Sequence, residues 1–156
     1  SSLYYKVKDR AVPDRAIVRI EGWDGRQAAA WGGKVCLWTS PNNSLWTVKC
    51  DYKDEPYSNR LQIETVGDSY MRIRDPKSLQ CVYSTPNVDD RIAWSADCNS
   101  DRALWRRTNK HRFVDVDGRE INFQWDDRYS YGNPFAYNYL SRGDTSTWSQ
   151  WKLVPQ

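Results

Sequence analysis

The sequence is poor in the residues on which most catalytic and metal-binding sites depend. It contains a single histidine, His111, and its four cysteines form no Cys-x-x-Cys pair. Protein zinc sites draw chiefly on cysteine and histidine, so few candidate ligands are present. The chain also lacks a Gly-x-Ser-x-Gly motif, a phosphate-binding P-loop and a His-Glu-x-x-His motif. We therefore expect no enzymatic activity, no metal site and no other cofactor.

A large excess of one charge sign and long apolar runs are missing too. Lys and Arg number 23 against 20 Asp and Glu, which gives a formal net charge of +3. The densest basic stretch, residues 106–112, is short and has acidic neighbours, which is typical of a solvated strand-and-loop face. Nucleic-acid binding needs a continuous basic stripe, and a transmembrane helix needs about 20 apolar residues. We expect neither.

Aromatic residues with a polar group are abundant, as are turn-forming residues. There are 9 Trp and 10 Tyr but only 3 Phe, and such rings serve both as core and as contact surface. One short helix is predicted at residues 26–31. Elsewhere, short apolar or alternating runs separated by turns indicate an all-β barrel or sandwich. The predicted strands are 16–20, 35–39, 44–48, 61–65, 70–73, 81–84, 92–94, 104–106, 113–116, 121–125, 135–140 and 150–154.

One segment of the chain is repeated. Cys36-Leu-Trp-Thr-Ser-Pro-Asn matches Cys81-Val-Tyr-Ser-Thr-Pro-Asn, about 45 residues further on, and the match sets Cys50 opposite Cys98. Four cysteines allow three disulfide connectivities. The likeness of the two segments favours Cys36–Cys50 and Cys81–Cys98. Two local disulfides indicate an oxidising compartment, so we expect a secreted, extracellular protein.

A third copy is found by aligning the strand that precedes each repeated segment. Residues 70–73 precede Cys81 by the same distance as residues 113–116 precede Gln124. The third copy then lacks its cysteine pair. We predict three units, at about residues 16–65, 66–108 and 109–154, each with four short strands. Such units close a pseudo-threefold barrel capped by hairpins, a β-trefoil, because no single unit can bury its own apolar face.

The repeat resembles that of the ricin B-type β-trefoil lectins. The second unit carries the fullest match, with residues 70–73, Leu79-Gln-Cys81-Val82, Cys98 and the closing Leu104-Trp105. The resemblance covers roughly residues 16–154, although Ala103 and Ser149 replace the glutamine of the family's closing Gln-x-Trp. It implies a lectin domain at residues 16–156, preceded by an extension or linker at residues 1–15. It also implies that Trp105 and Trp151 are core residues.

In the family, an aspartate two residues after the first cysteine accepts hydrogen bonds from two sugar hydroxyls, and an aromatic ring stacks on the sugar face. Carried over, that position is Trp38 in the first unit, Tyr83 in the second and Asp126 in the third. Only the third keeps a carboxylate, followed by an aromatic run in which alternate residues share a strand face. The predicted carbohydrate site comprises Asp126, Asp127, Tyr129, Tyr137, Asn138 and Tyr139. The alternative is that Asp126 caps a turn and the rings are core.

The first two units carry an aromatic ring in place of the aspartate. We interpret both as inactive and filled by Trp38 and Tyr83. Secondary sites rebuilt around these rings, with Asn42 and Asn87 from the adjoining turns, are the alternative. Turn geometry alone explains asparagine at such positions.

The resemblance implies a module that binds cell-surface glycans, of the galactose or N-acetylgalactosamine type, and contacts membranes only through them. Such trefoils often serve as the cell-targeting module of a larger secreted or oligomeric protein, such as a bacterial pore-forming haemolysin. Two other functions remain open. One is a Kunitz-type protease inhibitor with a reactive loop such as Asp75-Pro-Lys77-Ser. The other is a protein-binding trefoil without a sugar site.

Overall fold

The computed structural model describes residues 14–23, 34–39, 44–53, 58–86, 90–123, 135–143 and 145–156, with the main chain alone at residues 135–137. Every predicted strand is present, and these ranges contain no α-helix. The helix predicted at residues 26–31 lies outside them. Two short 3-10 helices occur, η2 (Asp101–Ala103) and η3 (Thr147–Ser149). The strands are β1 (Ile17–Gly22), β2 (Val35–Trp38), β3 (Trp46–Lys49), β4 (Leu61–Val66), β5 (Tyr70–Arg74), β6 (Cys81–Ser84), β7 (Ile92–Ser95), β8 (Trp105–Arg107), β9 (Phe113–Val114), β10 (Glu120–Phe123), β11 (Phe135–Ser141) and β12 (Trp151–Pro155).

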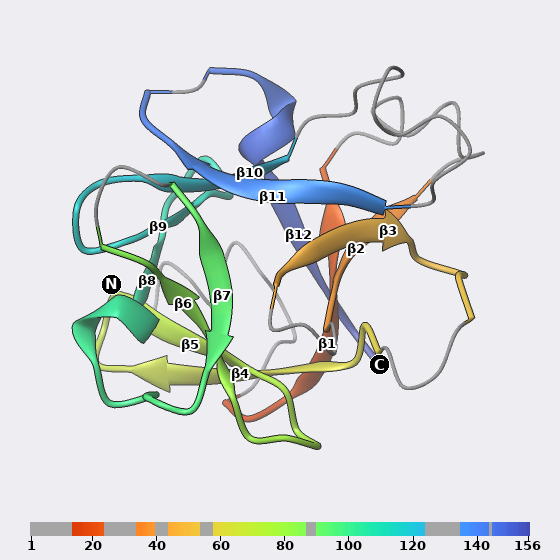
Figure 1. The fold of residues 1–156 in the computed structure, drawn as a ribbon, viewed down its shortest axis with the longest axis horizontal. Helices are drawn as coiled ribbons and strands as arrows, with labels where there is room; N and C mark the ends of the chain where they lie inside the picture. Colours follow the sequence, from red (N-terminus) through yellow and green to blue (C-terminus); the bar gives the residue numbers. More distant parts are fainter. Residues whose placement is uncertain are drawn as a thin grey trace.

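The first and fourth strands of each successive group of four form a barrel. Antiparallel pairs join β1 to β4, β4 to β5, β5 to β8 and β8 to β9, and β12 returns to pair with β1. A hydrogen bond from the Trp151 N–H to the His111 carbonyl joins β12 to the segment before β9. The remaining strands form the hairpins β2–β3, β6–β7 and β10–β11, with β11 alongside β3 (Figure 1). This architecture is a β-trefoil, as predicted.

The start of each fourth strand provides a common register for the three units. Leu61 pairs with Val18 and Trp105 pairs with Met71, while Trp151 bonds to His111. Leu61, Trp105 and Trp151 are therefore equivalent, and all three are fully buried. The predicted core position of both tryptophans is confirmed.

The indoles set the hairpins on the barrel. Trp105 Nε1 donates to the Val82 carbonyl and Trp151 Nε1 to the Ile121 carbonyl, both over 3.0 Å. Val82 and Ile121 thus hold equivalent positions in their units, and so do Cys81 in β6 and Glu120 in β10. The alignment that set Gln124 opposite Cys81 is wrong by four residues.

Two local features produce that error. Phe113 pairs with Arg107 where Ile73 pairs with Ile63, so Phe113 is equivalent to Ile73, three residues later than Tyr70, with which the sequence alignment had matched it. The turn that follows is also one residue shorter. It closes between Asp115 and Arg119, whereas the turn in the second unit closes between residues 75 and 80.

Two disulfides tie hairpins to the chain that follows them. Cys36 bonds to Cys50 and Cys81 to Cys98, with Cα–Cα distances of 5.0 and 5.5 Å, which confirms the predicted pairing. Both bonds lie outside the main apolar core, in small clusters of their own. Each therefore constrains a cap rather than the barrel. Within the described ranges no helix is long and apolar enough to cross a membrane.

The N-terminal boundary of the barrel lies slightly earlier than predicted. Arg15 N–H donates to the Ile63 carbonyl over 2.7 Å, and Thr65 N–H donates to the Asp14 carboxylate over 2.8 Å. The Thr65 N–H holds the pKa of Asp14 below its ordinary value. Asp14 and Arg15 thus pack with β4, although both fall within the predicted linker; residues 1–13 lie outside the described part of the chain.

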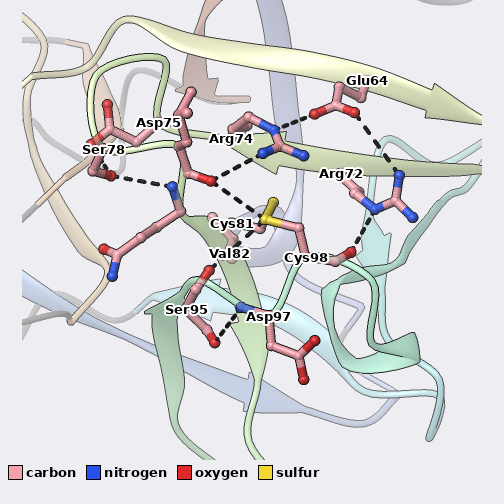
Figure 2. Close-up of a disulfide and its surroundings, with 12 residues drawn as sticks. Glu64, Arg72, Arg74, Asp75, Ser78, Cys81, Val82, Ser95, Asp97 and Cys98 are labelled. Atoms are coloured by element: carbon pink, nitrogen blue, oxygen red, sulfur yellow. Dashed lines mark hydrogen bonds and ion pairs between the residues drawn. A yellow bond between two sulfur atoms is a disulfide. The ribbon is translucent and has the colours of Figure 1, made fainter.

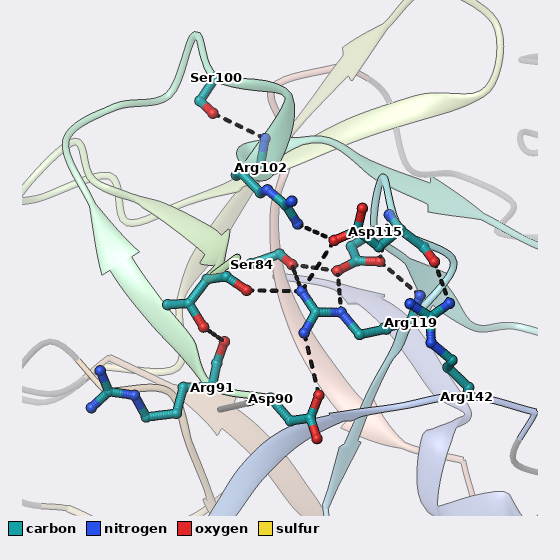
Figure 3. Close-up of polar contacts among 10 residues, drawn as sticks. Ser84, Asp90, Arg91, Ser100, Arg102, Asp115, Arg119 and Arg142 are labelled. Atoms are coloured by element: carbon teal, nitrogen blue, oxygen red, sulfur yellow. Dashed lines mark hydrogen bonds and ion pairs between the residues drawn. The ribbon is translucent and has the colours of Figure 1, made fainter. Parts of the chain in front are cut away.

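A buried ion pair joins the third unit to the second-unit hairpin. The side chain of Asp115 is fully buried and that of Arg119 is 5% exposed, with 3.1 Å between Nε and Oδ2. Ser84 donates its hydroxyl to Asp115, and Arg119 donates to Ser84 Oγ over 3.1 Å and to the Thr85 carbonyl over 2.8 Å (Figure 3). Asp90 and Asp117 also approach the Arg119 guanidinium, over 3.3 and 3.6 Å, but their side chains are more exposed, so Asp115 supplies the buried carboxylate of this network.

We expect Asp115→Ala to lower the free energy of unfolding by about 3 kcal/mol, because Ser84 and Arg119 would lose their fully buried carboxylate and only the more exposed Asp90 and Asp117 would remain beside Arg119. Urea denaturation followed by tryptophan fluorescence measures the change. Asp115→Asn should lose less stability, since its side-chain carbonyl can still accept hydrogen bonds from the main-chain N–H groups of Asp117 and Arg119. A wild-type unfolding midpoint for Asp115→Ala would contradict this account.

Candidate functional site

Most of the predicted sugar-contacting residues lie outside the described ranges. Asp126, Asp127 and Tyr129 belong to this group, as do Asn42 and Asn87 of the secondary sites. Their roles stay predictions. The strand register removes one reason for proposing Asp126, because this residue does not align with Trp38 and Tyr83.

The position two residues after the first cysteine is occupied by Trp38, Tyr83 and Asn122. Trp38 is buried and packs edge-on against Tyr52, with ring centroids 5.9 Å apart. Tyr83 is half-buried and packs against the Cys81–Cys98 cluster. Asn122 is buried and donates to Ser141 Oγ over 3.0 Å. None of the three offers an exposed carboxylate, so the family's aspartate is replaced in every unit.

β11 carries two further predicted site residues, Asn138 and Tyr139. Asn138 is 7% exposed. Its Oδ1 accepts a hydrogen bond from Thr47 Oγ1 over 3.0 Å, and its Nδ2 donates to the Asn122 carbonyl over 3.3 Å. The amide thus connects β3, β10 and β11. Tyr139 is half-buried opposite Asn122, and Tyr137 is described by its main chain, which pairs with Trp46.

The loop considered for protease inhibition is a closed turn. Asp75 N–H donates to the Gln80 carbonyl, and Leu79 N–H returns to the Asp75 carbonyl, both over 2.8 Å. The Asp75 carboxylate also accepts from Lys77 N–H and Ser78 Oγ. Arg74 ties this turn to Glu64, beside the Cys81–Cys98 disulfide (Figure 2). A tight turn with its main chain bonded internally is a poor match for an extended reactive loop.

A pocket of about 600 Å³ lies on the third unit. It is bounded by β8, the loop from β8 to β9, the start of β10 and the segment between β11 and β12. The loop is held in shape by Thr108, whose N–H donates to the Arg112 carbonyl over 3.0 Å and whose hydroxyl accepts from Arg112 N–H over 3.1 Å. The lining includes Arg106, Thr108, Lys110, Arg112, Glu120 and Gln150.

The charges of this pocket are mainly positive. Arg112 is 7% exposed and donates to Ser149 Oγ and to the Ser146 carbonyl. Arg106 and Lys110 are exposed at the rim. Glu120 supplies a buried carboxylate, which accepts a hydrogen bond from Ser141 Oγ over 3.4 Å. The pocket therefore offers cationic donors and one anionic acceptor to the same bound molecule.

Asp117 lies in the β9–β10 turn, next to the pocket residue Gly118. A hydrogen bond from Arg102, followed by the charges of Arg102, Arg119 and Arg142, holds the pKa of Asp117 below its ordinary value. This carboxylate is ionised at neutral pH and ion-paired outside the pocket lining, with Arg102 and Arg119. The positive field of the rim is thus not compensated by Asp117.

Sequence reasoning missed this pocket. The run of basic residues from 106 to 112 was visible, but it was interpreted as a solvated face. Strand pairing explains the difference, since Arg106 lies on the outer face of β8 between buried Trp105 and Arg107. The loop then folds back, so that Arg112 meets Ser146 and Ser149, which are distant in sequence.

One group of potential metal ligands occurs in the described part of the chain. Glu21 lies close to the sulfur atoms of Cys36 and Cys50. Both sulfurs are joined in a disulfide, and a thiolate is the form that binds metal. Glu21 is also ion-paired with Arg19 over 2.8 Å. This cluster therefore supports no metal centre.

The chain shares its fold with proteins of known structure. The designed 3-fold symmetric protein ThreeFoil aligns with a TM-score of 0.64 at 12% identity, over 90% of this chain and 99% of its own. The Haemophilus ducreyi cytolethal distending toxin aligns at 0.61 and 16% identity, over 90% of this chain and 83% of the toxin chain. A Polyporus squamosus lectin, bound to Neu5Aca2-6Galb1-4GlcNAc, aligns at 0.62 and 13% identity, over 90% of this chain and 49% of the lectin chain.

These similarities establish the fold. No protein-family model and no curated protein matches the chain. Structural likeness at such low identity carries no function by itself, because one fold hosts many unrelated sites.

We expect Asn138→Ala to lower the free energy of unfolding by about 1–3 kcal/mol, because the buried Thr47 hydroxyl and Asn122 carbonyl would lose their partner. Thermal and urea denaturation measure the loss. Asn109→Ala, at an exposed asparagine of the pocket rim, is the matched control and should leave stability almost unchanged. Equal stability of the two variants would argue against a structural role for Asn138.

Proposed function

We propose that this chain is a non-enzymatic carbohydrate-binding module that recognises cell-surface glycans. The observation that carries the proposal is the pocket on the third unit, where a carboxylate, guanidinium groups, hydroxyls and amides line one open depression. A pyranose presents hydroxyl donors and acceptors around its rim, and charged partners make the stronger hydrogen bonds to them. The trefoil suits this role because its core packs without these polar residues.

The fold neighbours add support of a weaker kind. One is a lectin solved with a sialylated galactose-containing glycan, and another is a toxin. With the resemblance of the second unit to ricin B-type lectins, they favour a galactose or N-acetylgalactosamine ligand and a role in targeting a secreted toxin. A single sugar site binds weakly, so several modules in a larger or oligomeric protein would raise the avidity.

Within this proposal the trefoil domain extends to residue 156 and the residues before it form a linker or extension. The site predicted from the sequence is a second candidate, separate from the described lining of the pocket: Asp126 is its proposed acceptor, with Tyr137 or Tyr139 as the stacking ring and Asp127 as a second polar contact. Its support is now the surrounding aromatic run alone, since the family position belongs to Asn122. Asn138 acts by supporting this hairpin, because its amide is bonded internally.

We expect the folded protein to bind galactose-terminated glycans on a glycan array. For galactose held at this second candidate site, Asp126→Ala should abolish binding and leave the melting temperature nearly unchanged, because the substitution removes the charge-assisted acceptor. Asp97→Ala is the control, since Asp97 is an exposed aspartate outside the third unit.

Two results would count against the proposal at different levels. Retained binding by Asp126→Ala would mean that the acceptor is another residue. Silence of the correctly folded wild-type protein on a broad array of neutral and acidic glycans would remove the carbohydrate function itself.

A further inference from the structure

We propose that the pocket on the third unit binds an acidic saccharide, a sugar that carries a carboxylate or sulfate group. The inference rests on the proposed carbohydrate function and names its ligand class at this site. With a volume of about 600 Å³, the pocket has the size of a small-molecule site and far exceeds an inorganic ion. Among the described residues of its lining, three cations and one carboxylate match a ligand that has both an anionic group and hydroxyl groups.

Arg112 is the central cation. The residue is 7% exposed, and its two terminal nitrogens donate to Ser149 Oγ and the Ser146 carbonyl, which are neutral acceptors. Among the residues that the structure describes, no carboxylate forms an ion pair with it. A buried charge is usually paired, because desolvation is costly. Here the positive charge is held in place by neutral groups, and its field remains available to an anion in the pocket.

Arg106 and Lys110 add positive charge at the rim. Both side chains are exposed, and neither forms an ion pair with any carboxylate of the described ranges. The main chain of Lys110 is fixed, since its N–H donates to Thr108 Oγ1 and its carbonyl accepts from Gln150 Nε2. Cations that converge on a depression raise the local concentration of anions and favour their binding.

Glu120 makes a sugar a better ligand than an inorganic anion. Glu120 lines the same pocket, and the residue is 9% exposed. It repels a bare sulfate or phosphate ion, but it accepts hydrogen bonds from hydroxyl groups. A ligand that carries an anionic group and neighbouring hydroxyls satisfies both sides of the pocket. Arginine suits the anionic end, since its planar donors match the geometry of carboxylate and sulfate oxygens.

The experiment compares four probes at low ionic strength by NMR titration: lactose, sialyllactose, sulfated lactose and sodium sulfate. We expect both acidic sugars to bind more tightly than lactose, and sodium sulfate to bind more weakly than either. Added salt should selectively weaken the binding of the acidic sugars, because exposed charges are screened.

The double variant Arg106→Ala with Lys110→Ala removes the rim charges without touching the buried core. We expect it to weaken the affinity for sialyllactose and sulfated lactose by roughly tenfold or more and to leave the affinity for lactose unchanged. Lys77→Ala with Arg91→Ala is the matched control, because it removes the same charge from exposed positions outside the pocket. In addition, Glu120→Gln should narrow the preference for acidic sugars over sodium sulfate.

Equal affinity for acidic sugars in the rim and control variants would overturn the inference, as would tighter binding of sodium sulfate than of sialyllactose. If lactose binds in an Asp126-dependent manner and the acidic sugars bind no better, only this inference fails. If no sugar binds the folded wild-type protein, the proposed function fails with it.

Discussion

Two indole N–H groups join the barrel of this protein to the hairpins that cap it, and the placement of the other elements depends on that junction. Trp105 bonds to the Val82 carbonyl and Trp151 to the Ile121 carbonyl, in full burial. A buried donor without an acceptor is costly, so each hairpin takes one register against the barrel. In the first unit Leu61 fills the equivalent place by apolar packing alone.

The loss of the cysteine pair from the third unit changes what that unit can hold. Glu120 occupies the position of Cys36 and Cys81, and its carboxylate is buried with polar partners instead of a covalent bond. The chain around Glu120 is also polar: Arg112 is buried and donates hydrogen bonds to Ser149 in η3 and to Ser146 just before it. A pseudo-symmetric fold thus carries an asymmetric chemistry, and the pocket forms in the unit that no described disulfide closes.

The strands were predictable because their causes are local. Apolar alternation and turn residues place β6 at Cys81–Ser84, with the predicted bounds. The third-unit register was not predictable, because it depends on the shortened turn between Asp115 and Arg119 and on the pairing of Phe113 with Arg107. Neither feature leaves a periodic signal in the sequence. Applying the strand spacing of the second unit to the third therefore displaced the candidate site by four residues.

The amino-acid sequence by itself determined the all-β class, the strand positions and both disulfides, since these follow from local periodicity and an internal repeat. The burial of Trp105 and Trp151 was implied by the resemblance of that repeat to the ricin B-type lectins. Only the tertiary structure decided that Asn122 shares the position of Trp38 and Tyr83. It alone brought Arg112 against Ser146 and Ser149 and made a basic run into the wall of a pocket. Barrel closure sets those contacts, and it couples residues too far apart for any local pattern to record.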